Sequence, residues 1–132
     1  MKKRITSTSL MALGFLVVVV LYIKAKHLMS AEGIQISQDY NNQQLMLAVS
    51  GELLRAFFTD WLYLYHKTNQ SLLTNALKFG LVCSALIGSI WLILGMEFLE
   101  SQDRLSFLID DGIILSLQGL VAGIVLWLVY RK

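Results

Sequence analysis

The feature that most restricts the fold of this sequence is a set of long apolar runs. Residues 5–23, 79–96 and 112–130 contain no Asp, Glu, Lys or Arg. A helix of nineteen residues is about 28 Å long, close to the roughly 30 Å hydrocarbon core of a bilayer. The sequence therefore predicts an all-α integral membrane protein with one membrane domain over residues 1–132.

The composition agrees with this prediction. Apolar residues make up 56% of the chain and charged residues 15%, whereas soluble domains carry about 45–50% and about 25%. The net charge is only +2 and the basic residues form no stripe, so nucleic acid is not an expected partner. The chain has no proline, which favours continuous helices over interrupted ones.

The first apolar run has an alternative interpretation as a signal peptide. The basic segment Lys2–Arg4 followed by residues 5–23 has the charged start and apolar middle of such a peptide. However, the residues after Ile23 include Lys24 and Lys26 and form no clean small-x-small cleavage site. We therefore expect residues 5–23 to remain in the protein as its first membrane helix.

Residues 45–65 form a more polar segment whose relation to the membrane is open. On a helical wheel, Glu52, Arg55, Thr59 and Asp60 gather on one side and large apolar side chains take the other. Such a helix either crosses the bilayer or lies in the interface with its charges in water. We predict four transmembrane helices; the alternative is three spans plus an interfacial amphipathic helix over residues 45–65.

The positions of lysine and arginine favour four crossings with both termini in the cytoplasm (N-in/C-in). Seven of these residues then lie inside and three outside, as the preference for cytoplasmic positive charge requires. Three crossings from a cytoplasmic N-terminus place four inside and seven outside. Three crossings from an external N-terminus force Lys2–Arg4 across the membrane. The predicted outer loops are 24–44 and 97–111, and the predicted inner loop is 66–78.

The charged residues of segment 45–65 are candidate functional positions, because each costs about 2.5–3.5 kcal/mol near the centre of a membrane helix. They could line a proton or cation path, or Glu52 and Arg55 could neutralise each other at i and i+3. In the interfacial alternative they face water. In the last span, Gln118 is expected to make an interhelical hydrogen bond, with Glu52 or Arg55 as candidate partner. The predicted intramembrane polar face is Glu52, Arg55, Thr59, Asp60 and Gln118.

Small residues recur at helical spacing in the last two apolar runs. They are Gly80, Ser84 and Gly88 in the first of these runs, and Gly112, Ser116, Gly119 and Gly123 in the second. Small side chains allow two helix backbones to approach closely in a membrane. We expect the two faces to pack on each other within one chain, and a dimer interface is the alternative.

Catalytic and metal-binding patterns are missing from the sequence. His27, His66 and the single Cys83 give no credible zinc ligand set. No serine-hydrolase, zinc-protease or phosphate-loop motif is present. The acidic segment 97–111 lacks calcium-loop spacing. We therefore expect no enzyme activity, no cofactor and no metal.

These features favour a small polytopic membrane protein that serves as a non-enzymatic accessory or assembly subunit through helix–helix packing. The expected partners are the lipid bilayer and other membrane helices, in a homo-oligomer or a membrane complex. The alternative is a small oligomeric ion-coupled transporter or channel that uses Glu52, Arg55 and Asp60. The compact loops and the basic start favour the inner membrane of a bacterium.

Overall fold

The computed structural model describes residues 2–29, 42–65, 72–97 and 104–131, and within them it contains only α-helices. The four helices are α1 (Lys2–Met29), α2 (Asn42–Tyr65), α3 (Leu73–Glu97) and α4 (Arg104–Tyr130). The predicted all-helical class is confirmed.

Three of the helices are long and apolar enough to cross a membrane. They are α1 over Lys2–Lys26, α3 over Leu73–Ile90 and α4 over Arg104–Tyr130. These helices contain the three apolar runs of the sequence. Helix α2, which carries Glu52, Arg55 and Asp60, is not among them.

The helices extend beyond the apolar runs and into parts of the segments predicted to be loops. Helix α1 continues to Met29 inside predicted loop 24–44, α3 begins at Leu73 inside predicted loop 66–78, and α4 begins at Arg104 inside predicted loop 97–111. Lys, Arg and Glu are good helix formers, so a change in polarity does not end a helix. The remaining parts of these loops, 30–41, 66–71 and 98–103, lie outside the described residues.

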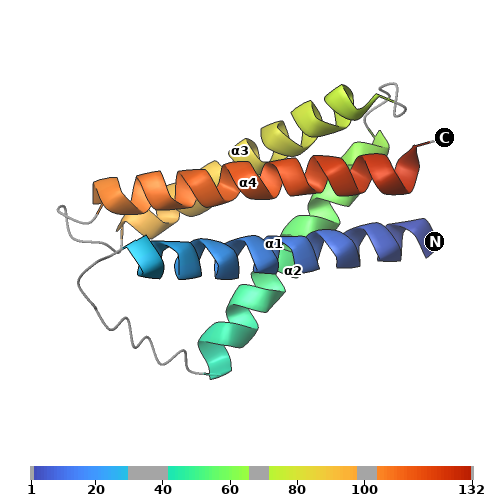
Figure 1. Cartoon of the computed structure of the whole chain (residues 1–132). Coiled ribbons are helices and arrows are strands. Elements are labelled where there is room, and N and C mark those ends of the chain that lie inside the picture. The colour runs from blue at the N-terminus through green and yellow to red at the C-terminus, as the bar shows by residue number, and fades with distance from the viewer. Residues whose placement is uncertain (1, 30–41, 66–71, 98–103, 132) are drawn as a thin grey trace.

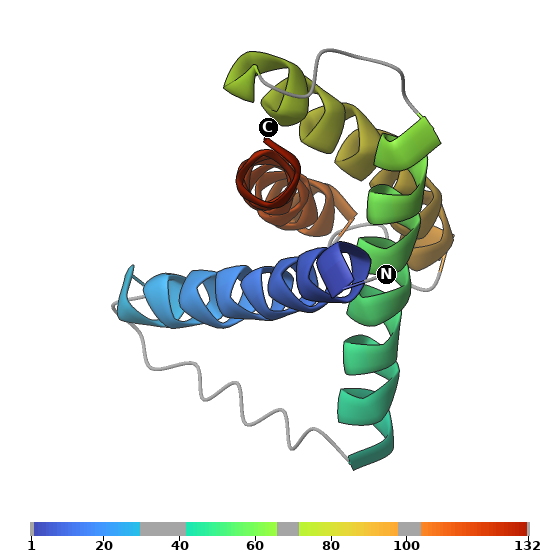
Figure 2. The same cartoon turned by 90° about the vertical axis from the view of Figure 1, so that its right-hand side faces the viewer.

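Helices α1, α4 and α3 lie next to one another in that order, and α2 crosses behind them (Figures 1 and 2). Helix α4 runs antiparallel to both of its neighbours (Figure 1). It packs mainly against α3 and α1, whereas α2 packs mainly against α1. The chain therefore consists of a three-helix layer with one steeply inclined helix on its back.

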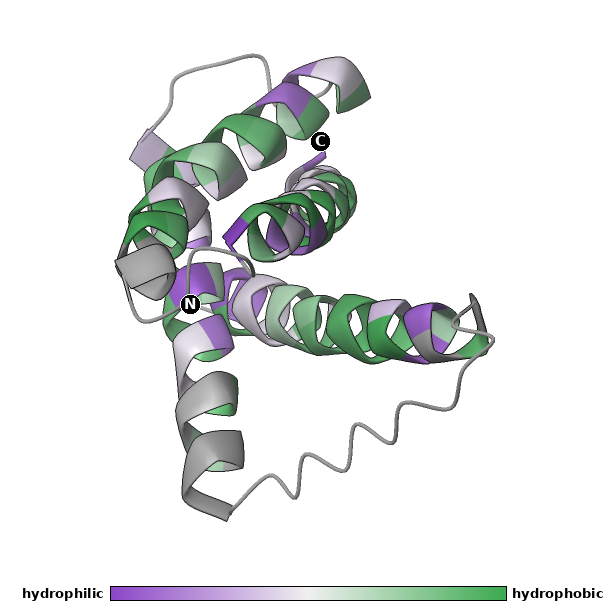
Figure 3. Cartoon of the chain, turned by 90° about the vertical axis from the view of Figure 1, so that its left-hand side faces the viewer, coloured by the Kyte–Doolittle hydropathy of each residue, from purple (hydrophilic) through white to green (hydrophobic). Residues whose placement is uncertain are grey.

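The buried residues lie where α2 meets this layer and along the α3–α4 contact. The largest of them are Met11 and Phe15 of α1, Tyr63 of α2 and Leu126 of α4, joined by buried alanines. Hydrophobic residues, drawn in green in Figure 3, make up much of the helical ribbon. Each helix exposes several large aliphatic side chains, for example Leu13, Leu54, Leu86 and Leu120.

Candidate functional site

Helix α2 turns its polar side toward the other helices and its apolar side outward. Thr59 and Asp60 are buried, whereas Leu54, Phe57 and Phe58 are exposed. A surface helix of a soluble protein has the opposite arrangement, with the apolar stripe against the core. The predicted polar face thus forms the contact between α2 and the three-helix layer.

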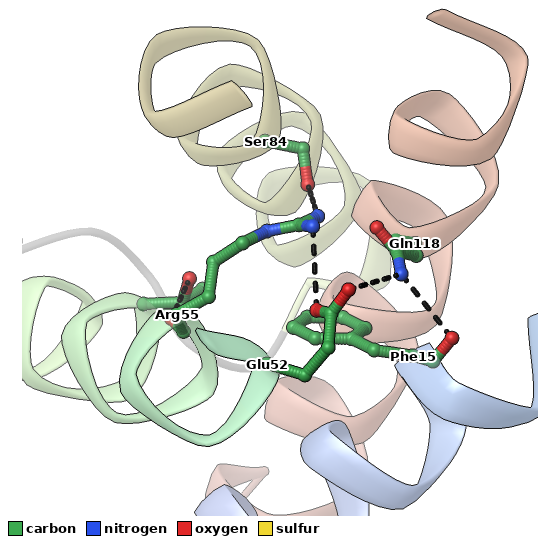
Figure 4. A network of polar contacts seen from close by, with 6 residues as sticks. Phe15, Glu52, Arg55, Ser84 and Gln118 are labelled. Carbon is green, nitrogen blue, oxygen red and sulfur yellow. Dashed lines mark hydrogen bonds and ion pairs between the residues drawn. The ribbon is translucent and has the colours of Figure 1, made fainter. Parts of the chain in front are cut away.

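A polar cluster at the middle of this contact joins all four helices (Figure 4). Arg55 Nη1 lies 3.4 Å from Glu52 Oε2, and Arg55 Nη2 donates to Ser84 Oγ of α3 at 3.4 Å. Gln118 Nε2 of α4 donates both to Glu52 Oε1 at 3.2 Å and to the carbonyl oxygen of Phe15 in α1 at 3.2 Å. The Arg55 guanidinium also lies 4.8 Å from the centroid of the Phe15 ring. We call these five residues the central cluster.

The central cluster is electrically balanced. Glu52 and Arg55 are one turn apart on α2, which allows their charges to pair. Gln118 is completely buried, and its amide nitrogen supplies the second hydrogen bond to the carboxylate. Its own carbonyl oxygen Oε1 has no hydrogen-bond partner within the described part of the chain. The cluster thus holds one partly buried cation and one partly buried anion, together with one buried acceptor that has no partner among the described residues.

A second cluster surrounds Asp60, whose side chain is completely buried. The Tyr130 hydroxyl of α4 donates to Asp60 Oδ1 at 2.8 Å, and Arg4 Nε of α1 lies 3.5 Å from Asp60 Oδ2. Tyr63 packs between Phe79 and Tyr130, at ring-centroid distances of 5.1 Å and 5.7 Å. Asp60 thus connects the C-terminal half of α2 to the first turn of α1 and the last turn of α4.

A third group lies at the opposite ends of α1 and α4. Lys26 forms an ion pair with Asp110, and the Tyr22 hydroxyl donates to the same carboxylate at 2.7 Å. This group ties the end of α1 to the beginning of α4.

The sequence did not predict that Arg4 and Tyr130 contact Asp60. It also did not predict the ion pair between Lys26 and Asp110. Arg4 was predicted to be a cytoplasmic flank, and Lys26 and Asp110 were predicted to lie in loops. A usable signal existed for Asp60: in the predicted topology it lies near the same membrane surface as Arg4 and Tyr130. Matching residues by depth would have suggested both partners.

The small residues of α3 and α4 divide into two groups. A Cβ atom at Gly123 would lie 2.6 Å from the Leu77 Cα, and one at Gly80 would lie 2.7 Å from the Gly123 nitrogen. Gly119 faces Leu81 and Ser84, with the Leu81 Cα 3.0 Å from an added Cβ. These residues therefore lie where the two backbones approach most closely, between two helices of one chain.

The other predicted packing residues lie outside this close approach. An added Cβ at Gly112 would meet nothing within 4 Å, and one at Gly88 would meet the flexible side chain of Leu115. Ser116 is exposed and donates to the Gly112 carbonyl oxygen at 2.8 Å. Gly112 and Ser116 do line a shallow groove together with Ser84.

The charged side chains on the inner side of α2 pair either within α2 or with α1. Within the described residues, no three His, Cys, Asp or Glu side chains are grouped to hold a metal ion. Glu52 and Asp60 each lie beside an arginine. Comparison with protein-family models, with curated proteins and with solved structures finds no match.

Proposed function

We propose that this protein is a four-span membrane protein with both termini in the cytoplasm, and that it is a non-enzymatic accessory or assembly subunit acting through helix packing. The observation that carries the proposal is the inverted polarity of α2, with its charges inward and its large apolar side chains outward. An interfacial helix would direct the same charges toward water and headgroups. A membrane-spanning helix directs them toward its neighbours, because lipid cannot solvate them.

The directions of the helices support four crossings. The beginnings of α1 and α3 and the ends of α2 and α4 lie toward one side in Figure 1. The ion pair of Arg4 with Asp60 lies at this end of the molecule, where α1 begins and α4 ends. The pair of Lys26 with Asp110 lies at the opposite end. If the end with Arg4 and Asp60 faces the cytoplasm, this arrangement agrees with the distribution of lysine and arginine.

A labelling experiment decides whether α2 crosses the membrane. Single cysteines replace the exposed residues Ala25 and Thr74, which lie before and after α2, in a chain that carries Cys83→Ala. A membrane-impermeant maleimide applied to intact cells should label position 25 and leave position 74 unlabelled until the membrane is opened. Labelling of both positions from the same side would mean that α2 does not cross. This comparison does not depend on the absolute orientation.

The accessory role is supported by the pairing of the polar groups with one another. The charges of the central cluster are balanced, and the exposed surface of all four helices is rich in aliphatic side chains. Apolar helix surfaces are suited to contact lipid and other membrane helices, where packing and small residues drive association. The outward side of α2 and the layer it crosses therefore offer surfaces for such contacts.

Photocrosslinking tests this role. A photoreactive phenylalanine analogue at exposed Leu54 or Phe58 should form adducts with another protein in native membranes. The same analogue at the buried Tyr63, where it replaces another aromatic ring, is the matched control and should not. If the outward positions of α2, and the corresponding Leu13 and Leu120, yield lipid adducts alone, the accessory role is wrong.

The inward-facing carboxylates of α2 support one alternative, an ion-coupled transporter or channel. Glu52 and Asp60 lie among helices, where ionisable residues often mark ion paths. The test uses purified chain in vesicles: Glu52→Gln should abolish proton-coupled flux if the alternative holds. We expect no such flux from the native chain, because Arg55 and Gln118 already engage both carboxylate oxygens.

A further inference from the structure

Helices α2 and α3 leave an open groove between them. It is lined by Leu62 and Tyr65 of α2 and by one stripe of α3, which consists of Asn75, Lys78, Phe79, Val82, Cys83 and Leu86. The two helices make few direct contacts, in contrast to the close α3–α4 pair. In a membrane, lipid or another helix must fill such a groove. Most of its lining is apolar, and contact between that lining and water is unfavourable.

The groove has different chemistry at its two ends. Tyr65, Asn75 and the exposed Lys78 lie at the end where α2 finishes and α3 begins. Phe79, Val82, Cys83 and Leu86 continue away from that end along α3. The groove is therefore polar and positively charged at one end and apolar along the rest, which matches a molecule with an anionic head and an apolar tail.

The length of the groove distinguishes a lipid chain from a helix. From Phe79 to Leu86, the apolar part of the groove, the helix rises about 10 Å, which fits within the roughly 15 Å of one half of a hydrocarbon core. A partner helix that spans the bilayer would need an apolar face of about 30 Å. The groove reaches no deeper than one leaflet and has a cation at the level of the headgroups. Both features favour a phospholipid as its occupant.

We propose that this groove binds one acyl chain of an anionic phospholipid, whose net negative headgroup pairs with Lys78. The chain packs against Phe79, Val82, Cys83 and Leu86 and fills the space between α2 and α3. In the proposed topology the headgroup belongs to the cytoplasmic leaflet, whose anionic lipids attract basic residues. The inference rests on the proposed membrane location and is independent of the accessory role.

The test compares retained lipid by native mass spectrometry of the full chain released from nanodiscs. The nanodiscs contain phosphatidylglycerol and phosphatidylcholine with identical acyl chains. We expect one retained phosphatidylglycerol in preference to phosphatidylcholine. Lys78→Gln should reduce that preference about fivefold, since one interfacial lysine contributes roughly this factor. Lys2→Gln, at an exposed lysine outside the groove, is the matched control and should change nothing.

A second pair of variants tests the apolar part of the groove. Val82 is 56% exposed and lines the groove, whereas Val20 of α1 is 51% exposed on a different helix. Val82→Trp fills the groove and should abolish lipid retention, whereas Val20→Trp should not. If circular dichroism shows that Val82→Trp does not fold, Lys78→Gln still tests the proposal, because this substitution adds no bulk.

Two results would overturn the proposal. Equal retention of both lipids, unchanged by Lys78→Gln, would show that the groove does not select an anionic headgroup. A lipid-free dimer that Val82→Trp dissociates would show that a helix of a second copy fills the groove. Either result leaves the labelling and crosslinking tests of the proposed function unaffected.

Discussion

At the scale of single residues, the two inward-facing carboxylates of α2, partly buried Glu52 and buried Asp60, are neutralised in different ways. Glu52 has a cation on its own helix, one turn away, and an amide donor from α4. Asp60 depends on partners from α1 and α4, namely Arg4 and Tyr130. Loss of a partner leaves a charge buried without compensation, which costs more than the net contribution of the intact pair.

For Asp60, we predict that Tyr130→Phe lowers the free energy of unfolding by about 1.5–3 kcal/mol, the usual contribution of a hydrogen bond to a charged group. The substitution keeps the ring that packs on Tyr63 and removes only the donor. The measurement is equilibrium unfolding of the purified chain in mixed micelles. The control is Tyr65→Phe. Tyr65 lies at the end of α2, as Tyr63 does, but it is exposed. Equal effects of the two substitutions would contradict the assignment.

For the central cluster, we predict strong coupling between Glu52 and Arg55. Arg55→Leu alone should lower the free energy of unfolding by about 3–5 kcal/mol, because it leaves the Glu52 carboxylate unpaired. Glu52→Leu combined with Arg55→Leu should recover most of this loss, since the polar pair is replaced by apolar side chains. A double-mutant cycle measures the coupling. Additive single effects would show that the two charges do not compensate each other.

At the scale of elements, the α3–α4 contact depends on backbone approach at a few glycines. Gly123→Ala would place a methyl group 2.6 Å from the Leu77 Cα, and backbone cannot yield as a side chain can. We predict a loss of about 1–3 kcal/mol in the free energy of unfolding, the usual cost of overpacking.

Gly112 is the matched control for this prediction, because its added Cβ meets nothing within 4 Å. Gly112→Ala should be neutral or stabilise α4 by up to about 1 kcal/mol, since alanine is the better helix former. The same unfolding assay compares the two variants. A loss at Gly112 as large as that at Gly123 would mean that both substitutions act through something other than the α3–α4 contact.

The elements also show how far the sequence alone predicts this fold. The apolar helices were predictable because run length and missing charge determine them locally. The end of α1 and the beginnings of α3 and α4 were not predictable. Helix hydrogen bonding continues beyond the apolar residues, for example through Lys26 and Asp110. Glu52 and Arg55 were predictable as a pair from their spacing. The partners of Asp60 were not, because Arg4 and Tyr130 are 56 and 70 positions away and meet it only through the packing of three helices.

At the scale of the whole molecule, the chain is divided into a layer built on close packing and one helix, α2, that contacts this layer through buried Ala56 and Tyr63 and through polar side chains. Helices α3 and α4 meet at glycines, whereas α2 is held by the central cluster and by Asp60. Buried polar groups in some proteins specify one orientation rather than add stability. For α2 this predicts that its charges determine how it lies against the layer.

The variant that combines Glu52→Leu, Arg55→Leu and Asp60→Leu tests this division. It makes α2 more apolar, so its insertion into lipid becomes easier, but it removes the polar contacts that orient the helix. Spin-label distances should broaden between exposed positions Leu13 and Leu54, which report on α1 and α2. They should stay narrow between Ile90 and Leu117, which report on α3 and α4. A narrow α1–α2 distance in this variant would mean that side-chain shape alone orients α2. Broadening of both distances would mean that the layer itself depends on the charges of α2.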